Sequence, residues 1–463
     1  MKMKKLTTII TALAICGWTG SSWSASPQDV ERLGKDLTPV GAERAGNKDG
    51  SIPAWEGVDK PLAGWSYGKQ RSEFWKYKAE KTLFTIDAGN VDKHADKLTP
   101  GQIQLIKQKK GYTMPVYPSH RSCGYPDFVT DNTRSGAGKS KIGSDGWSLE
   151  DATLPGVPFP VPASGIEAVW NFLMRYNGIG TDFPEGRTVV SPAPGSDKRI
   201  QVGWTQAFYF PWAARGAHKP KDGNSLQAGV YYGYVEPAAL AGQAIVQRYY
   251  FGKDNESFYY FTGQRRVRRL PSYAYDAPLI GFENQYPVDM SAIFSGNPDR
   301  FNWRIVGKKE LYVPYNNFAL RNFNADINSA LMPDFVSPDV RRYELHRVWH
   351  IEGTLKDGVR HAAARKTLYL DEDSWIAVAG DDIDAQGKIW KTKENGVLPS
   401  WEIGACTGFV QQNFYDFNSG RYVADMVVFG TGKDIRSIDN AASDARMKDS
   451  YYTAESLRTT SER

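Results

Sequence analysis

The feature that most constrains this chain is an alternation of apolar and polar residues with period two, which runs over residues 187–432. Successive side chains of a β-strand point to opposite faces, so this pattern is typical of strands with one buried face. Two sets of aromatic and aliphatic residues each share one side of a predicted strand: Val202, Trp204, Phe208, Phe210 and Trp212, and Phe301, Trp303 and Ile305. Closely spaced turn signals at 356–358, 371–374, 385–387 and 418–420 predict an antiparallel meander.

We therefore predict a mainly β protein with a few helices, whose residues 186–440 form a large half-open antiparallel β-barrel or curved sheet of about ten strands. A long meander curls to hide its edges, and a barrel of more than eight strands leaves room for a ligand unless something plugs it. Aromatic residues make up 13% of the chain, and its 44 glycines and 26 prolines agree with many strands and turns.

Residues 25–185 are rich in glycine, proline and isolated tryptophans, and we predict that they wrap around the β region. Two helices are expected there. Thr99 and Pro100 supply an N-cap and a first-turn proline for a helix through Lys110, and Ser164 with Glu167 reads as a capping box. Residues 441–463 form a polar C-terminal tail, and the chain after residue 432 is expected to fray.

Residues 1–24 have the three parts of a secretory signal peptide: three lysines, an apolar run over 6–18, and small residues before a cleavage site after Ser24. Two alternatives stay open, namely an anchoring helix and lipid attachment at Cys16. The rest of the chain has no run of 18 apolar residues, so we expect an exported, soluble protein.

Charge and cysteine content bear on partners and compartment. Removal of residues 1–24 takes away three lysines and no acidic residue, which lowers the formal charge from +5 to +2. This near neutrality gives no support to nucleic-acid binding. Cys123 and Cys406 would remain in an oxidising compartment, where we expect one long-range disulfide; two buried free thiols are the alternative.

Signatures of chemistry are weak, and we predict no catalytic residue, metal site or cofactor. The segment Gly136–Ser140 resembles a phosphate-binding loop, but Thr133 stands where its first glycine should be. His346 and His350 lie on a predicted strand, which separates their rings by roughly 13 Å. A hydrolase built from scattered residues remains possible, with His120, His346, His350 and His361 as available bases.

One strand is unusually basic, because Arg265, Arg266, Arg268 and Arg269 place positive charge on both of its faces. One interpretation is an edge strand kept soluble by charge. The other is a docking patch for a phosphate head group or an acidic partner, since arginine binds both well.

Several longer motifs carry a resemblance to a known family. They are Leu37 to Asn47 leading to Ile52–Trp55, Pro158–Pro160 before the Trp170 helix, Gly263–Pro271, Lys308–Asn316 and Tyr369–Trp375. In these the chain resembles the bacterial family called domain of unknown function 1329, which is grouped with the LolA/LolB-like lipoprotein-localisation factors. The resemblance implies a half-open barrel capped by helices, with acyl chains in an apolar cavity. It also implies a periplasmic location, and an outer-membrane barrel protein and an inner-membrane exporter as partners.

The leading hypothesis is thus a periplasmic carrier whose ligand is a hydrophobic small molecule or acyl chain. Candidate ligand-binding residues are Trp204, Phe208, Phe210, Trp303, Trp349 and Trp375. The alternatives are a cell-envelope hydrolase of lipids or polyesters, and a ligand-free adaptor that docks to an outer-membrane protein through its arginines.

Overall fold

One large, mainly antiparallel sheet organises the chain in the computed structural model, which describes residues 26–220, 225–270 and 273–462. The strands are β1 (Phe84–Ile86), β2 (Met114–Val116), β3 (Lys141–Ile142), β4 (Leu149–Glu150), β5 (Gly180–Val190), β6 (Ile200–Tyr209), β7 (Leu226–Glu236), β8 (Ala244–Tyr250), β9 (Glu256–Phe261), β10 (Arg266–Arg269), β11 (Phe301–Pro314), β12 (Tyr343–Leu355), β13 (Arg365–Asp371), β14 (Ala377–Ile383), β15 (Ile389–Asn395), β16 (Leu398–Ser400), β17 (Ala405–Thr407), β18 (Gln412–Asp416), β19 (Tyr422–Val427) and β20 (Arg436–Ile438). The helices are α1 (Pro27–Arg32), α2 (Pro100–Gln108), α3 (Asp127–Gly136), α4 (Gly165–Leu173), α5 (Ile327–Ala330) and α6 (Ala454–Ser461). The predicted signal peptide lies outside the described residues, and none of the helices described has the length and apolar content to cross a membrane.

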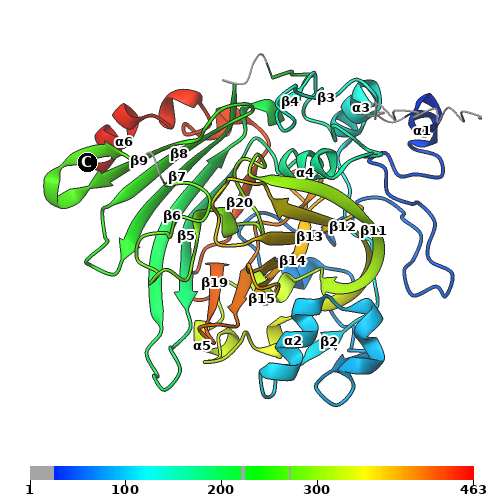
Figure 1. The fold of residues 1–463 in the computed structure, drawn as a ribbon, viewed down its shortest axis with the longest axis horizontal. Helices are drawn as coiled ribbons and strands as arrows, with labels where there is room; N and C mark the ends of the chain where they lie inside the picture. Colours follow the sequence, from blue (N-terminus) through cyan, green and yellow to red (C-terminus); the bar gives the residue numbers. More distant parts are fainter. Residues whose placement is uncertain (1–25, 221–224, 271–272, 463) are drawn as a thin grey trace, which may run out of the picture.

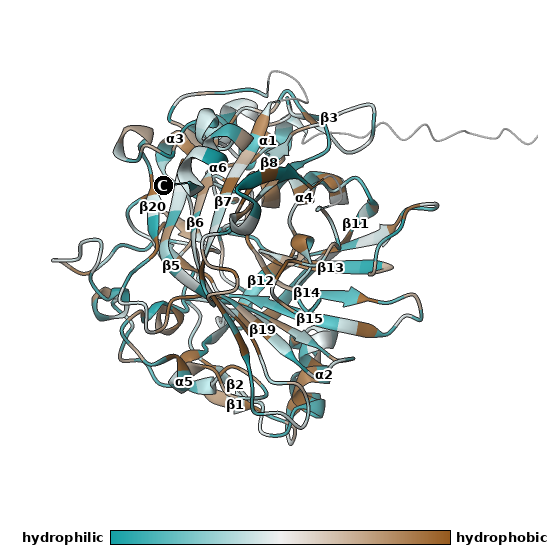
Figure 2. Cartoon of the chain, turned by 90° about the vertical axis from the view of Figure 1, so that its left-hand side faces the viewer, coloured by the Kyte–Doolittle hydropathy of each residue, from teal (hydrophilic) through white to brown (hydrophobic). Residues whose placement is uncertain are grey.

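The main sheet has 16 strands in the order β1-β2-β12-β13-β14-β15-β18-β19-β5-β6-β7-β8-β9-β10, with β11 paired to β12 and β20 paired to β5. Strands β5–β9 fan out on the left of Figure 1, and β11–β15 lie on the other side of the molecule. Figure 2 shows these two groups of strands at an angle to each other. The end strands β1 and β10 are not paired with each other. The predicted mainly β fold with a large curved sheet is therefore confirmed, and this sheet does not close into a barrel.

The strand count exceeds the predicted ten because 13 strands between β5 and β19 belong to the sheet, and three short strands outside the alternating region also join it. β1 and β2 come from the N-terminal region, and β20 follows the meander. β5 begins at Gly180, before the predicted boundary at 185/186. The four predicted turns lie between consecutive strands.

Both predicted helices form where the sequence places their first turns. In α2 the side chains of Thr99 and Gln102 make a complete capping box. In α4 the predicted box is incomplete, because Ser164 makes no side-chain cap and Glu167 instead accepts a bond from the backbone N–H of Ala163 at 2.6 Å. Gly165 lets α4 approach β11 closely, since a Cβ atom there would lie 2.3 Å from the backbone nitrogen of Arg304.

We call the face of β6–β8 that carries Phe208 and Val230 the inner face. It is covered by α4 and by residues 273–297, which connect β10 to β11 and share one hydrophobic cluster with these strands. The opposite face of β7–β10 is covered by α6 and the residues before it. Both faces of β8 and β9 are therefore largely covered, whereas Val235 on the outer face of β7 and the arginines of β10 stay exposed.

The polar tail is an ordered part of the fold, which corrects the expectation that it frays. Tyr452 is fully buried against Gly229 of β7, and Leu457 of α6 is 1% exposed. Arg248 on β8 donates a hydrogen bond to the Tyr452 carbonyl at 2.8 Å. These anchors are single apolar residues in a polar sequence, so they leave no periodic signal.

A disulfide joins Cys123 to Cys406, which are 283 residues apart in sequence. Cys123 lies in the N-terminal region and Cys406 in the short strand β17, and both are buried. The carbonyl of Cys123 also accepts a bond from Trp55 Nε1 at 2.7 Å. The disulfide therefore links the N-terminal region covalently to the β region.

Replacing both cysteines by alanine should lower the free energy of unfolding by up to about 5 kcal/mol, because the closed loop is very long. Chemical denaturation of the oxidised protein and of the C123A/C406A variant measures this difference. The two proteins should become similar once the native protein is reduced. Equal unfolding midpoints under oxidising conditions would contradict the prediction.

Candidate functional site

A cavity of about 150 Å³ lies between strands β6–β8 and the covering segment 273–297. Its lining residues are Leu173, Arg175, Asn177, Gln206, Phe208, Phe210, Gln227, Ala228, Val230, Tyr232, Tyr234, Ile245, Gln247, Tyr249, Leu279, Phe282, Tyr286, Val288, Ser291, Ala292, Phe294, Ser295, Gly296, Phe409 and Asp425. Most of these are apolar or aromatic, which is typical of small-molecule sites. An apolar cavity of roughly this volume can hold a molecule the size of benzene.

Strand β7 forms one wall of the cavity through its alternation. Ala228, Val230, Tyr232 and Tyr234 all point to the inner face and line the cavity. Val235, on the other face of the same strand, is 48% exposed. The period-two pattern thus brings these four side chains to the cavity, and Gln227 joins them at the irregularity in the pairing of β7 with β8.

The covering segment 273–297 forms the opposite wall. Its apolar side chains, such as Phe282 and Phe294, are buried in the same cluster as β6–β8. Ala292 and Ile293 have positive φ values of 55° and 75°, which are strained for residues with a side chain. The surrounding contacts must therefore hold this segment in place.

Buried lysines of β13 and β15 supply those contacts. Lys366 Nζ lies 3.0 Å from Asp289 Oδ2, and His361 Nε2 lies 2.9 Å from the same oxygen. Lys393 Nζ donates to the carbonyl of Ile293 at 2.9 Å, and Lys391 Nζ donates to that of Gln285 at 2.9 Å. Burial alone would raise the pKa of Asp289, but the charges of Lys366 and His361 outweigh it and hold that pKa well below its ordinary value.

A second buried acid, Asp425, faces the cavity from β19. Its carboxylate accepts hydrogen bonds from Tyr286 and Thr188, and Thr188 in turn accepts one from Trp204 Nε1 at 2.8 Å. Burial raises the pKa of Asp425. Both carboxylate oxygens are thus satisfied by the protein.

The six aromatic residues predicted to bind the ligand differ in their position relative to the cavity. Phe208 and Phe210 line the cavity. Trp204 is fully buried beneath it, and Trp303 packs edge-on against Phe294 of the covering segment. Trp349 and Trp375 stack on each other with ring centroids 5.9 Å apart, away from the cavity lining.

The arginine-rich stretch lies on the edge strand β10, which pairs only with β9. Arg265, Arg266, Arg268 and Arg269 are all exposed. Arg269 pairs with Glu256 at 3.1 Å, and Arg268 bonds the side chain of Gln264. None of the four lines the cavity.

Sequence reasoning missed most of the cavity wall. Tyr232, Tyr234 and Tyr249 follow strand alternation, and that signal could have found them. The residues of segment 273–297 show no period, so only the tertiary structure brings them to the cavity. Arg175 and Asp425 are single charged residues with no motif around them.

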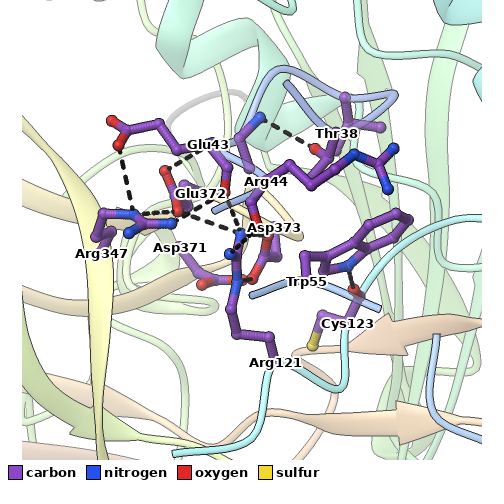
Figure 3. A network of polar contacts seen from close by, with 12 residues as sticks. Thr38, Glu43, Arg44, Trp55, Arg121, Cys123, Arg347, Asp371, Glu372 and Asp373 are labelled. Atoms are coloured by element: carbon purple, nitrogen blue, oxygen red, sulfur yellow. Dashed lines mark hydrogen bonds and ion pairs between the residues drawn. The ribbon is translucent and has the colours of Figure 1, made fainter. Parts of the chain in front are cut away.

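A separate polar cluster lies where the N-terminal segment meets the sheet, as Figure 3 shows. Arg121 bonds both carboxylate oxygens of Asp373, at 2.9 and 2.7 Å. Arg347 Nε lies 2.6 Å from Glu372 Oε1, and both arginines donate to the carbonyl of Glu43. Two of the motifs behind the family resemblance, 37–47 and 369–375, are thus held together by two buried arginines.

Three residues of the same cluster are of the types that bind metal ions. His346, Asp371 and Asp373 offer ligand atoms within 4.8 Å of one another. Arg121 already occupies both oxygens of Asp373, whereas Asp371 Oδ1 is buried without a partner. Burial and the neighbouring charge of Asp373 raise the pKa of Asp371 to about 7. The arrangement favours a structural network in which Asp371 keeps its proton to a higher pH than an ordinary aspartate.

The comparisons with known proteins agree with the sequence resemblance. The family model for proteins of unknown function called DUF1329 matches residues 85–458. This chain belongs to the DUF1329 family. An uncharacterized protein of Pseudomonas aeruginosa, PA3922, is 36% identical over 408 residues, which cover 87% of this chain and 88% of that protein.

Three solved structures are similar in fold. A putative outer membrane lipoprotein-sorting protein domain from Vibrio parahaemolyticus has 10% identity and a TM-score of 0.42, and covers 64% of this chain and 98% of its own. A DUF1329 family protein from Desulfovibrio piger has 14% identity and a TM-score of 0.38, and the match covers 60% of this chain and 92% of that protein's chain. The LolA superfamily protein NE2245 from Nitrosomonas europaea has 12% identity and a TM-score of 0.32 (61% and 96% covered).

From the raised pKa of Asp371 we predict how the stability of the protein depends on pH. Between its ordinary value of 3.8 and about 7, the folded protein holds a proton that the unfolded chain has lost, so the stabilisation from this group falls as pH rises. Asp371→Asn removes this titration. The midpoint of thermal unfolding of D371N should therefore rise relative to that of the native protein as pH is raised from 5 to 8.

The exposed turn residue Asp357 offers a matched control, because D357N makes the same chemical change outside the cluster. Its unfolding curve should follow that of the native protein at every pH. Parallel curves for D371N and the native protein would show that Asp371 is ionised in the folded state.

Proposed function

We propose that this protein is a periplasmic carrier that binds a hydrophobic, lipid-like small molecule in the cavity between β6–β8 and segment 273–297. The observation that supports it is the cavity itself, whose wall consists mainly of apolar and aromatic side chains. Hiding apolar surface from water contributes about 25 cal/mol per Å², so such a site lowers the cost of moving a lipid-like molecule through water. The predicted signal peptide supports the location.

The volume sets the size of ligand that fits without rearrangement. At about 150 Å³ the cavity admits a short chain or a ring. A full acyl chain requires the apolar side chains of segment 273–297 to move out of the inner face.

The hydrolase hypothesis finds less support in the geometry. Its candidate bases were His120, His346, His350 and His361, and none of them lines the cavity. Three of them pair with acids: His120 with Glu80, His346 with Glu344, and His361 with Asp289. The cavity described is suited to binding.

A larger side chain on the inner face of β7 should block the cavity. Val230→Phe fills part of it, so binding of a fluorescent apolar probe should weaken about tenfold or more, as measured by fluorescence titration. The matched control is Val235→Phe on the outer face of the same strand, which should bind as the native protein does. Circular dichroism would check that both variants fold, because overpacking a core costs about 1–3 kcal/mol.

Unchanged probe binding by folded V230F would overturn the proposal for this cavity. An independent check is to extract the protein, purified from its host without denaturant, and to search the extract for a stoichiometric lipid-like molecule by mass spectrometry. A protein that carries nothing and takes up no probe would contradict the carrier function.

A second candidate function is that of an adaptor that docks to an outer-membrane barrel protein. It is favoured by the exposed, unpaired edge of β10 and its arginines. The double variant R266E/R268E should then lose co-purification with that membrane protein, while probe binding in the cavity stays unchanged. The control R215E/R360E reverses two exposed arginines elsewhere and should keep the interaction. Equal co-purification of both variants would exclude docking through β10.

A further inference from the structure

Arg175 follows the C-terminus of α4 and lines the cavity, with only 8% of its surface exposed. Its side chain makes one hydrogen bond, from Nη1 to the carbonyl of Phe172 at 2.7 Å, and lies over the ring of the same residue. Nε is buried and has no acceptor among the described residues. The Nε–Nη2 edge of the guanidinium is thus left unused by the protein.

The charge of Arg175 is also uncompensated. Arg71 and Arg321 are equally buried, but each pairs with Asp434 at 2.9 and 2.6 Å respectively. In the described parts of the chain no carboxylate forms an ion pair with Arg175. Burial therefore lowers its pKa to about 10. Leaving a cation in an apolar wall without a counter-charge is costly, which makes this position unusual in the fold.

The other residues that line the cavity indicate which chemical group of a ligand would pair with Arg175. Among the described residues, Arg175 is the only basic residue that lines the cavity, and the only acidic one, Asp425, is satisfied by Tyr286 and Thr188. Asn177 also lines the cavity, and its buried side-chain oxygen has no donor among the described residues, but an amide oxygen is an acceptor and does not bond a carboxylate. The unused hydrogen-bond donor beside the largely apolar wall is therefore on Arg175.

We infer that the ligand is an amphiphile with a carboxylate at one end, which pairs with the Nε–Nη2 edge of Arg175 while its apolar chain lies along β7. Two parallel N–H donors on a planar guanidinium match the two oxygens of a carboxylate. A single cation balances a carboxylate, whereas a phosphate dianion would need a second positive charge, and no other lysine or arginine lines the cavity in the described residues. This assignment of the ligand class rests on the proposed carrier function.

A purely structural role for Arg175 makes a different prediction. Its bond to the Phe172 carbonyl caps the end of α4, and a cation there also interacts favourably with the helix dipole. Under that role alone, removing the side chain would destabilise the protein and leave ligand preference unchanged. Under the binding role, removing an unpaired buried charge should leave the empty protein equally stable or more stable.

The test compares octanoate with octanol, which share a chain and differ in the charged group. Isothermal titration should show that the native protein binds octanoate more tightly, and that Arg175→Met reduces octanoate affinity roughly 10- to 100-fold with little change for octanol. Arg215→Met, an exposed arginine outside the cavity lining, should behave as the native protein does. Thermal unfolding of the empty variants provides the second readout.

Each outcome separates the two proposals. If the native protein binds octanol and V230F does not, this result supports the carrier function, independently of the result for R175M. Equal affinities of native protein and R175M for octanoate, or a destabilised R175M with unchanged preference, would overturn the carboxylate assignment while leaving the carrier function in place. Octyl phosphate that binds more tightly than octanoate would also overturn it. If neither octyl compound binds, both proposals fail.

Discussion

The open edge of the sheet is the constraint on which the rest of the structure depends. A curved sheet that does not close must have its inner face covered, and here segment 273–297 provides much of the cover. Within this segment the regular secondary structure is the short 3-10 helix Val288–Met290, so many backbone groups need partners from elsewhere. Lys391 and Lys393 donate to its carbonyl groups from β15, and Lys366 of β13 pairs with the side chain of Asp289. Buried ion pairs add little net stability, yet they fix one arrangement of the segment.

The N-terminal region is attached by the same type of interaction. Arg121 and Arg347 bind backbone carbonyls of the N-terminal segment and also the acidic turn after β13. The disulfide between Cys123 and Cys406 adds a covalent link close to Arg121 in the sequence. Two of the family motifs therefore serve to join distant segments of the chain, whereas the cavity lies on the inner face of β6–β8. A motif that is prominent in the sequence need not mark the place where a ligand binds.

Sequence patterns predicted the sheet and part of the cavity, for a physical reason. Alternation reports which face of a strand is buried, so Phe208 and Phe210 could be assigned to an apolar interior. It cannot report which part of that interior is filled by another segment. Trp303 obeys the same alternation, but Phe294 of the covering segment packs against it. Trp375 lies in the turn between β13 and β14 and stacks on Trp349. Arg175 was unpredictable, because an arginine after a helix normally reads as a C-terminal cap and only the tertiary structure shows that it lacks a counter-charge.

Under the proposed carrier function, the covering segment and a ligand compete for the same apolar surface, and this competition sets the affinity. Phe282 and Phe294 already bury surface that a long acyl chain would occupy, so a ligand gains only the difference between its own burial and the cost of displacing them. Asp289 and the lysines pair with the polar groups of the segment. Under the proposed carrier function, a weak net affinity would allow the ligand to be released as well as bound. Under the proposed carboxylate assignment, the unpaired charge of Arg175 would provide selectivity that apolar burial alone cannot, since a carboxylate gains a partner there and a neutral chain does not.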